Sequence, residues 1–407
     1  MLGERIRKLR KQKKMTLEAL AGEELTKGML SLIENNKAKP SMESLAYIAK
    51  QLEVDVADLL EEISSQELRE ILEKAENLFN ANLKENPIKY EQVITLIEPI
   101  IDKLMHGYES ARLLDIYSRC LYYEKKNDWQ DYLERAAIIY DQINLTSNRA
   151  SIGIFRSMVK FTDHDYSFAL NLLLEERSHI EANHAYIDPI TRVNLDYHES
   201  ILHFAVGDNQ SAEKVMENAI HFSKENRIFY LTDDLYRLAA ANALMFKNEE
   251  KKSYYLQKIK QYGEFAEDIQ SILFYKLFDV MSLNEDKKDY SKALKEIDEF
   301  FSEPDTSNIF IHWFHLEKGK ALYGLGLFEE AISSLEKVEI PSFACHPFDL
   351  SLFYVMDSYK ALCHLKLGHT SNALHFANIA VENFAPLPQT PFKDFSQETY
   401  DMIKHKM

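Results

Sequence analysis

Histidine and cysteine are the side chains of this sequence whose chemistry would suit catalysis or metal binding. His312 and His315 have the spacing of two ligands on one helical turn, but the aromatic residues between them favour a core or groove position. The Cys345-His346 pair is isolated, and Gly324-Leu-Gly326 follows no expected strand, so it is not a phosphate-binding loop. Neither a His-Glu-x-x-His signature nor a Gly-x-Ser-x-Gly nucleophile occurs. We therefore expect no enzyme, no metal site and no cofactor.

Charge is the more informative chemistry, because it is unevenly distributed. Residues 1–50 hold eleven Lys and Arg against six Asp and Glu, a net charge of +5. The chain as a whole has a net charge of -17, so the other 357 residues carry -22. A basic N-terminal region on an acidic body indicates nucleic-acid binding at one end only, since the body would repel phosphates.

Long helices are the elements that must position these residues. Only 11 Gly and 10 Pro occur in 407 residues, which favours an all-α fold over a β-sandwich with its frequent turns. No apolar run approaches the ~20 residues needed to cross a bilayer, and no apolar segment follows the first cations as in a secretion signal. The three cysteines form no CxxC pair. We expect a cytoplasmic protein without disulfides or membrane contact.

Capping residues and apolar spacing predict five short helices in the first sixty residues. The first covers about residues 2–12, and the others begin after a side chain that can accept a hydrogen bond from the first helical turn. Gly22 permits the chain reversal between the second and third helices, and Pro40 prevents the third from continuing. The expected caps are Thr16, Thr26, Ser41 and Asp55.

These residues resemble a known domain. The stretches LGERIRKLR, MTLEALA, LTKGMLSLIENNKAKPSMESLAYIAKQLEV and DVADLL are similar to a Cro/repressor-type (XRE) helix-turn-helix domain, which we assign to residues 1–62. The resemblance implies a buried ion pair between Arg10 and Glu34, whose role is structural. Two positions depart from the family pattern: Leu17 follows the capping Thr, and Asn35-Asn36 replaces the usual turn containing Gly.

The resemblance also implies which residues contact double-stranded DNA. The recognition helix starts at Thr26, and its N-terminal residues would face base edges in the major groove. Lys27 can reach guanine, and Met29 can lie against a thymine methyl group. Other cations would position the domain on phosphates. The base-facing candidates are Thr26, Lys27, Gly28, Met29 and Ser31, and the further DNA contacts are Arg5, Lys8, Lys11, Thr16, Lys37 and Lys39.

Residues 63–407 show a weak repeat with a period near forty. The segment 319–335 resembles a tetratricopeptide repeat, with small residues and an aromatic at the expected spacing. We expect stacked helix pairs in a right-handed tetratricopeptide-like superhelix, closed by a last helix from about Phe395; a helical bundle without repeats is the alternative. The repeat anchors are Ala169, Ala212, Ala293, Ala331 and Ala373, with degenerate copies near Val93, Tyr132 and Ser253.

A helix-turn-helix domain joined to such repeats resembles the RRNPP family of peptide-sensing regulators, in layout most like its neutral-protease-regulator and arbitrium-receptor types. The resemblance implies a transcription regulator in quorum sensing. A short signalling peptide would bind in the concave groove of the repeats and change a homodimer or tetramer. It also implies that some members bind a response-regulator protein.

Side chains on the first helix of each pair are the candidates for peptide contact. Asn side chains can donate to and accept from a peptide backbone at once, and Arg119 can receive a peptide carboxylate. The charge of -22 favours a peptide that bears a cation. The groove candidates are Asn194, His198, Asn242, Asp279, Glu317 and Tyr359.

Peptide binding would act on DNA through dimer geometry. Two recognition helices must lie about 34 Å apart to enter successive major grooves. A peptide that favours one arrangement of the dimer would change this separation. The alternative is a scaffold whose repeats dock a folded protein, such as a response regulator of a sporulation phosphorelay, with DNA binding secondary.

Overall fold

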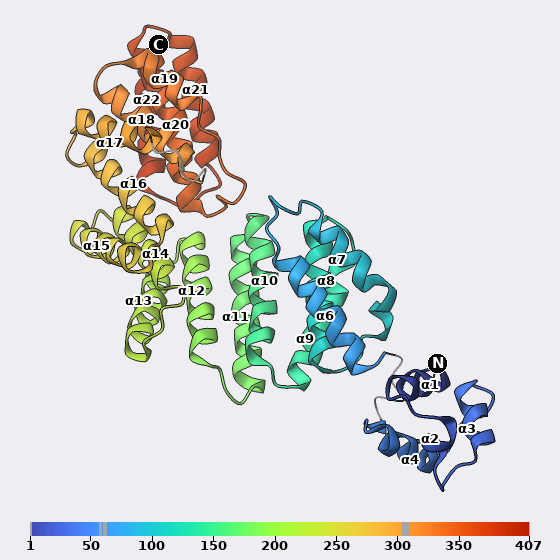
Figure 1. Cartoon of the computed structure of the whole chain (residues 1–407). Helices are drawn as coiled ribbons and strands as arrows, with labels where there is room; N and C mark the ends of the chain where they lie inside the picture. The colour runs from blue at the N-terminus through green and yellow to red at the C-terminus, as the bar shows by residue number, and fades with distance from the viewer. Residues whose placement is uncertain (1, 57–58, 60–62, 303–308, 407) are drawn as a thin grey trace. The chain divides into compact units, whose positions relative to one another are not determined.

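The computed structural model describes residues 2–56, 59, 63–302 and 309–406, and within them the chain is helical without a strand. It divides into two compact units, Met1–Ile152 and Gly153–Met407, with the division inside α10 (Thr146–Thr162). Figure 1 shows the order of the helices along the chain. The first unit contains α1 (Leu2–Gln12), α2 (Leu17–Ala21), α3 (Lys27–Glu34), α4 (Met42–Leu52), α6 (Ser65–Asn80), α7 (Lys89–Ile97), the 3-10 helix η1 (Glu98–Lys103), α8 (Gly107–Tyr123) and α9 (Trp129–Gln142).

The second unit continues from α10 as pairs of helices. In the first pair, Ser157 and Arg156 of α10 contact Ala169 and Glu176 of α11 (Tyr166–Asn183). The other pairs are α12 (Pro189–Val206) with α13 (Asn209–Asn226), α14 (Thr232–Met245) with α15 (Glu249–Ala266), α16 (Ile269–Glu285) with α17 (Tyr290–Ser302), α18 (Ile311–Gly324) with α19 (Phe328–Leu335), and α20 (Pro347–Lys366) with α21 (Thr370–Phe384), followed by α22 (Pro391–His405). This confirms the all-α fold of stacked helix pairs; the handedness of the superhelix stays a prediction.

The N-terminal helices form where their caps were predicted. The side chains of Thr16, Thr26 and Ser41 each accept a hydrogen bond from the backbone three residues on. Their apolar faces meet in one small core, in which Ile6, Leu20, Leu30, Ile48 and Leu52 are fully buried. The helix expected after Asp55 falls largely on residues outside the described ones, although Leu59 is described and buried.

The repeat anchors mark the second helix of each pair. Five predicted alanines are fully buried, because a small side chain there lets the two helices of a pair approach closely: Ala169, Ala212, Ala293, Ala331 and Ala373. In four of the second helices the residue four positions before the anchor caps the helix: Asp165, Asp208, Asn248 and Asp289.

The degenerate copy predicted near Ser253 is centred on Lys252, four residues after the cap Asn248. Lys252 is buried, and its ammonium group lies 2.8 Å from carboxylate oxygens of both Glu249 and Asp286. A lysine thus takes the alanine position because its charge is paired there, which sequence periodicity does not reveal.

The last helix also begins earlier than predicted, at Pro391 instead of Phe395. Thr390 caps it, and Pro391 takes the first helical position, where its missing N–H costs no hydrogen bond. The proline therefore starts this helix instead of interrupting it.

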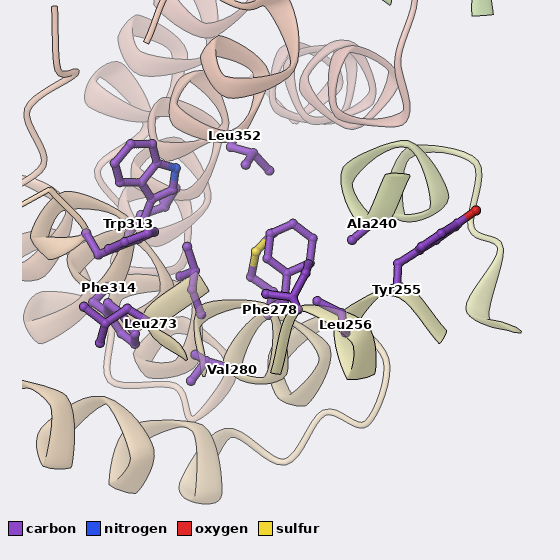
Figure 2. Close-up of a cluster of buried hydrophobic side chains, with 14 of the residues drawn as sticks. Ala240, Tyr255, Leu256, Leu273, Phe278, Val280, Trp313, Phe314 and Leu352 are labelled. Carbon is purple, nitrogen blue, oxygen red and sulfur yellow. The ribbon is translucent and has the colours of Figure 1, made fainter. Parts of the chain in front are cut away.

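Aromatic residues fill the space between helix pairs in the second unit. The rings of Phe300 and Phe314 stack with centroids 3.8 Å apart, and Trp313 lies 4.6 Å from Phe353. Figure 2 shows Trp313 and Phe314 in a cluster with Leu273, Phe278 and other apolar side chains from several helices. His312 and His315 flank this cluster, in line with the expected core or groove position.

Candidate nucleic-acid interface and repeat-domain cavity

The helix α3 presents its N-terminal face to solvent. Thr26 caps it, and Lys27, Gly28 and Met29 are exposed, whereas Leu30 and Ile33 are buried in the domain core. Ser31 is only partly exposed. The backbone of the first turn is thereby fixed, and the side chains that were predicted to face bases are free of the core.

An exposed leucine on the same face was missed by sequence reasoning. Leu32 is 45% exposed and Met29 is 38% exposed. They are three residues apart, so they are neighbours on the helix surface. The signal was available, since Leu30 and Ile33 already occupy the core face and leave Leu32 outside it. An apolar pair at this place suits contact with thymine methyl groups.

Lys27 is held by an acidic side chain from the preceding helix. Its ammonium group forms an ion pair with Glu18 of α2, and both side chains are mostly exposed. The hydrogen bond from Lys27 lowers the pKa of Glu18. In free protein this pair keeps the Lys27 side chain near the start of α3.

The predicted ion pair between Arg10 and Glu34 is present. The Arg10 guanidinium donates two hydrogen bonds to the Glu34 carboxylate, at 2.6 and 2.8 Å, and a third at 2.9 Å to the Met15 carbonyl. The two side chains are only 11% and 4% exposed. Hydrogen bonding to Glu34 raises the pKa of Arg10. The pair fixes the C-terminal end of α3 against α1.

The unusual Asn35-Asn36 turn is explained by a close contact with α1. Asn36 adopts a left-handed backbone with φ of 56°, which Asn tolerates better than most residues. Its side chain accepts a hydrogen bond of 2.9 Å from the Gly3 N–H. A Cβ atom on Gly3 would lie 2.0 Å from the Ile33 carbonyl oxygen, so α1 can approach α3 only through a glycine.

The structure corrects one predicted phosphate contact. Arg5 is 9% exposed, and its guanidinium donates a 2.8 Å hydrogen bond to the Leu59 carbonyl, so this side chain supports the fold and cannot reach a phosphate. Lys8 is exposed and paired with Glu67. The remaining predicted DNA contacts outside α3 are exposed: Lys11, Thr16, Lys37 and Lys39.

The second unit contains a cavity of about 340 Å³. Most of its wall is apolar, and it comes from helices far apart in the sequence together with the segments before α20 and α22. The residues on which the following argument depends are Tyr197, Asp234, Arg237, Asn242, His346 and Asp349.

The segment before α20 reaches this cavity because it packs against early helices of the same unit. The Tyr166 hydroxyl donates a 2.8 Å hydrogen bond to the Cys345 carbonyl, and a His346 ring nitrogen lies 3.2 Å from the Ile201 carbonyl oxygen. His346 also caps α20 by accepting from the Phe348 N–H. Burial lowers the pKa of His346 to about 4, so its ring is neutral at physiological pH. The Cys345-His346 pair therefore makes structural contacts within this unit.

Several polar atoms in the cavity wall lack a partner among the described residues. The Oδ1 atom of Asn242 and the Nε atom of Arg237 are buried without a hydrogen bond. Asp349 has neither a hydrogen bond nor an ion pair with the described residues, and burial raises the pKa of its carboxyl to about 6. Unpaired buried polar groups are costly, and a cavity lined by them is suited to a polar ligand.

Of the seven predicted peptide contacts, only Asn242 lines the cavity. Arg119 lies in the first unit, where its guanidinium is 2.6 Å from an oxygen of the buried Asp115 and bonds Ser151. Glu317 is 2% exposed and forms an ion pair of 2.7 Å with the buried Lys320, so it belongs to the core. Both are corrections, because these charges are already paired within the fold.

The other four predicted contacts lie outside the cavity wall. Burial lowers the pKa of His198, whose ring bonds the Asn194 carbonyl one turn earlier. Asp279 faces Lys287 at 3.8 Å. Tyr359 packs on Phe395, with ring centroids 5.4 Å apart. Sequence reasoning missed Arg237, His346 and Asp349, which come together only in the folded unit.

Two features are absent from the residues that the structure describes. No helix among them combines the length and the apolar composition that a membrane crossing requires. Those same residues contain no cluster of three or more His, Cys, Asp or Glu side chains arranged to hold a metal ion.

Comparison with solved structures gives several helical proteins at low identity. One is PlcR of Bacillus thuringiensis in complex with the peptide PapR7 and DNA, with 17% identity, coverage of 65% of this chain and 95% of that chain, and a TM-score of 0.36. Another is the competence regulator ComR of Streptococcus vestibularis with its signalling peptide XIP, with 19% identity, 66% and 94% coverage, and a TM-score of 0.36. Both TM-scores are below 0.5, so the overall similarity of these structures to this chain is weak.

The comparison of sequences is more specific for the N-terminal end. Comparison with curated proteins gives no match. Residues 3–64 match the family model described as "Helix-turn-helix domain". This range contains the capped α3, its exposed N-terminal face and the Arg10–Glu34 pair. Residues 3–64 therefore match the helix-turn-helix domain family, as the sequence predicted, and they precede a domain of paired helices, the layout on which the resemblance to the RRNPP family rests.

Proposed function

We propose that this protein is a transcriptional regulator whose binding to an operator is controlled by a short signalling peptide held in the repeat-domain cavity. The observation that carries the proposal is the combination, in one chain, of an exposed recognition helix and a cavity with unpaired polar atoms. We place the boundary between the two functions at residues 62 and 63, as the sequence predicts.

The DNA-binding half of the proposal rests on α3. Its positive N-terminal end and its exposed side chains suit insertion into a major groove. Lys27 would exchange Glu18 for a base edge, and Met29 with Leu32 would contact thymine methyl groups. With Arg5 removed and Leu32 added, the proposed set is Lys8, Lys11, Thr16, Thr26, Lys27, Gly28, Met29, Ser31, Leu32, Lys37 and Lys39.

The peptide-binding half rests on the cavity. Its volume of about 340 Å³ is at the low end of the range of about 300–1,000 Å³ for ligand sites, so it would hold a few side chains of a peptide and not a long segment. Asn242 would accept a hydrogen bond from the peptide. Since the segment before α20 both lines the cavity and contacts α12, a bound peptide would favour the arrangement in which these elements meet.

Regulation would act through a dimer or tetramer. An operator with two half-sites requires two recognition helices about 34 Å apart. We propose that peptide binding favours one of two geometries of the dimer and thereby raises or lowers its affinity for the operator. The size of this change is limited by how much more tightly the peptide binds one geometry than the other.

The test measures DNA affinity and oligomer mass together. The full-length protein first selects fragments from sheared genomic DNA of its source. Fluorescence anisotropy then measures Kd for a selected fragment, and light scattering measures mass, with and without synthetic peptides that match short reading frames beside the gene. We expect at least one peptide to change both quantities, whereas its scrambled version changes neither.

The scaffold alternative makes a different prediction. If no fragment is enriched, or if every peptide leaves both Kd and mass unchanged, the proposal is wrong. Recovery of one folded protein at equimolar amount from lysate, with DNA binding unaffected by peptides, would instead support docking of a response regulator or similar partner.

A further inference from the structure

The charges at the repeat-domain cavity are predominantly negative. Asp234 and Asp349 line it, and Asp233 and Asp268 lie behind it, against the single guanidinium of Arg237. Arg237 is already engaged, at 3.1 Å from Asp233 and 3.3 Å from Asp268. One paired cation leaves the cavity with excess negative charge.

Among the residues that the structure describes, no side chain balances the carboxylate of Asp349. It has no hydrogen bond or ion pair within the described parts of the chain, and burial alone raises its pKa to about 6. An ionised carboxylate in such surroundings is costly unless a cation or donor joins it. The cost would be removed by a positive group of a ligand.

The hydroxyl of Tyr197 lies within electrostatic range of several of these carboxylates. Burial is the main cause that raises the pKa of its hydroxyl, and the charges of Asp234, Asp233 and Asp349 raise it further, while Arg237 opposes them. Carboxylates from α14 and from α20 therefore influence one hydroxyl in the cavity wall. The Oδ1 atom of Asn242 is also without a hydrogen-bond partner among the described residues, so the cavity wall contains several acceptors that a donor group of a ligand could bind.

The rest of the wall is apolar. Aromatic rings from α10, α12, α16 and α20 face the cavity, and they suit an apolar body attached to the charged group: Phe161, Phe204, Phe274 and Phe348. Aromatic faces also attract cations. The carboxylates and the aromatic rings of the cavity wall together suit a ligand that joins a positively charged group to an apolar body.

We infer that the cavity selects its ligand through a cationic group, an ammonium or a guanidinium, that pairs with Asp349 while the adjoining apolar part of the ligand packs on the aromatic wall. This deepens the proposed function and rests on it: the signalling peptide carries a Lys, an Arg or a free N-terminus next to an apolar residue, and that residue pair enters the cavity.

The first test uses a small probe of this chemistry on the full-length protein. 2-Phenylethylamine carries an ammonium group on an aromatic body, and 2-phenylethanol is its neutral counterpart. At pH 7.5 we expect the amine to raise Tm in a saturable manner and the alcohol to have no such effect, because a ligand that binds only the folded state stabilises it. In Asp349→Asn, the affinity for the amine should fall about 10- to 100-fold, as for the loss of a charged hydrogen bond.

A matched variant controls for the change of charge. Asp298→Asn removes one carboxylate from the same unit at an exposed ion pair with Lys318, away from the cavity, and should keep the wild-type response to the amine. The ligand-free Tm of each variant shows that it folds. Equal responses of wild type to amine and alcohol, or an undiminished response in Asp349→Asn, would overturn the inference.

A second test separates this inference from the proposed function. A displayed library of heptapeptides is selected on full-length wild type, Asp349→Asn and Asp298→Asn. Enrichment of Lys or Arg beside an apolar residue in wild type and Asp298→Asn, but not in Asp349→Asn, supports both proposals. Enrichment of neutral or acidic peptides contradicts the inference that the cavity selects a cationic group, but it still supports peptide binding. If no peptide is enriched but the wild-type protein responds to the amine, the proposal that the cavity binds a peptide is contradicted, and the inference that it selects a cationic group is supported.

Discussion

The two ends of this molecule build their candidate sites in opposite ways. The DNA-facing surface consists of one short helix, in which a cap and about two helical turns determine what is exposed. The cavity collects residues from α10, α12, α14, α16 and α20, which are separated by up to about 190 positions. The comparison teaches that a site on one element can be read from sequence, whereas a site between distant elements depends on their packing.

The largest expected effect tests whether the N-terminal domain depends on one buried contact. Arg10→Ala or Glu34→Ala leaves the other charge buried and unpaired, and each should lower the free energy of unfolding by about 3–5 kcal/mol. Urea titration followed by hydrogen exchange of residues 2–56 measures this loss. The double variant Arg10→Met with Glu34→Leu should lose less than either single variant, since no charge is left alone. Additive losses would show that the pair contributes little as a unit.

The next prediction concerns the electrostatic cost of the Asp349 carboxylate in the cavity wall. The pKa of Asp349, about 6, lies above its ordinary value near 4, so the folded state favours the protonated carboxyl. Below pH 4 the carboxyl is protonated in both the folded and the unfolded state and carries no penalty; the penalty grows as the pH rises from about 4 to 6 and reaches about 3 kcal/mol above that.

Asp349→Asn removes this dependence. Without ligand, it should raise the free energy of unfolding by up to about 3 kcal/mol at pH 7.5 and by about half as much at pH 5. The groups that face Asp349, including Tyr197, Asp234, Arg237 and His346, are common to both proteins, so they largely cancel in the difference. Denaturant melts at the two pH values measure it, and a gain that is independent of pH would refute the assignment.

A smaller effect is expected from substitutions in α3, which show whether this helix recognises the base sequence of the operator. Lys27→Ala or Met29→Ala should weaken operator binding by about 1–2 kcal/mol, roughly 5- to 30-fold, and should relax preference at the base pair that each contacts. Lys50→Ala on α4 is the matched control, since it removes an exposed lysine of the same domain that we do not assign to the interface. Competition with single-base operator variants measures preference. Unchanged discrimination in both α3 variants would exclude α3 as the reader.

The smallest effect distinguishes positioning from specificity. Lys37→Ala should weaken binding to all sequences alike and reduce the slope of log K against log salt by about 0.9, the value for one phosphate contact. Anisotropy titrations over a range of salt concentrations measure the slope. A sequence-dependent loss would move Lys37 from the phosphate contacts to the base contacts.

Much of the fold followed from local signals. Thr16, Thr26 and Ser41 cap the helices predicted for them, and the five alanine anchors are buried as expected. These predictions succeed because capping and helix pairing depend on residues within a few positions of one another. The Arg10–Glu34 pair was also correct, and it came from resemblance to a known domain.

The errors share a physical cause. Arg5, Glu317 and Lys252 are charged residues with partners in distant parts of the chain, namely Leu59, Asn284 and Asp286, so their burial could not be inferred from residue type. Asp349 was missed because its role depends on its surroundings in the fold, where no described residue supplies a partner cation. Periodicity identifies which side of a helix is buried, but it does not tell which distant helix will meet a given side chain.

The contacts between the segment before α20 and the helices α11 and α12 limit how this array can evolve. An open solenoid can gain or lose a repeat, because each unit contacts only its neighbours. Here Tyr166 and Ile201 bond Cys345 and His346 across 179 and 145 positions. Insertion of one more helix pair between α13 and α20 would displace those partners and open the cavity, so the number of repeats in this interval is fixed by closure, and duplication is tolerated only outside it.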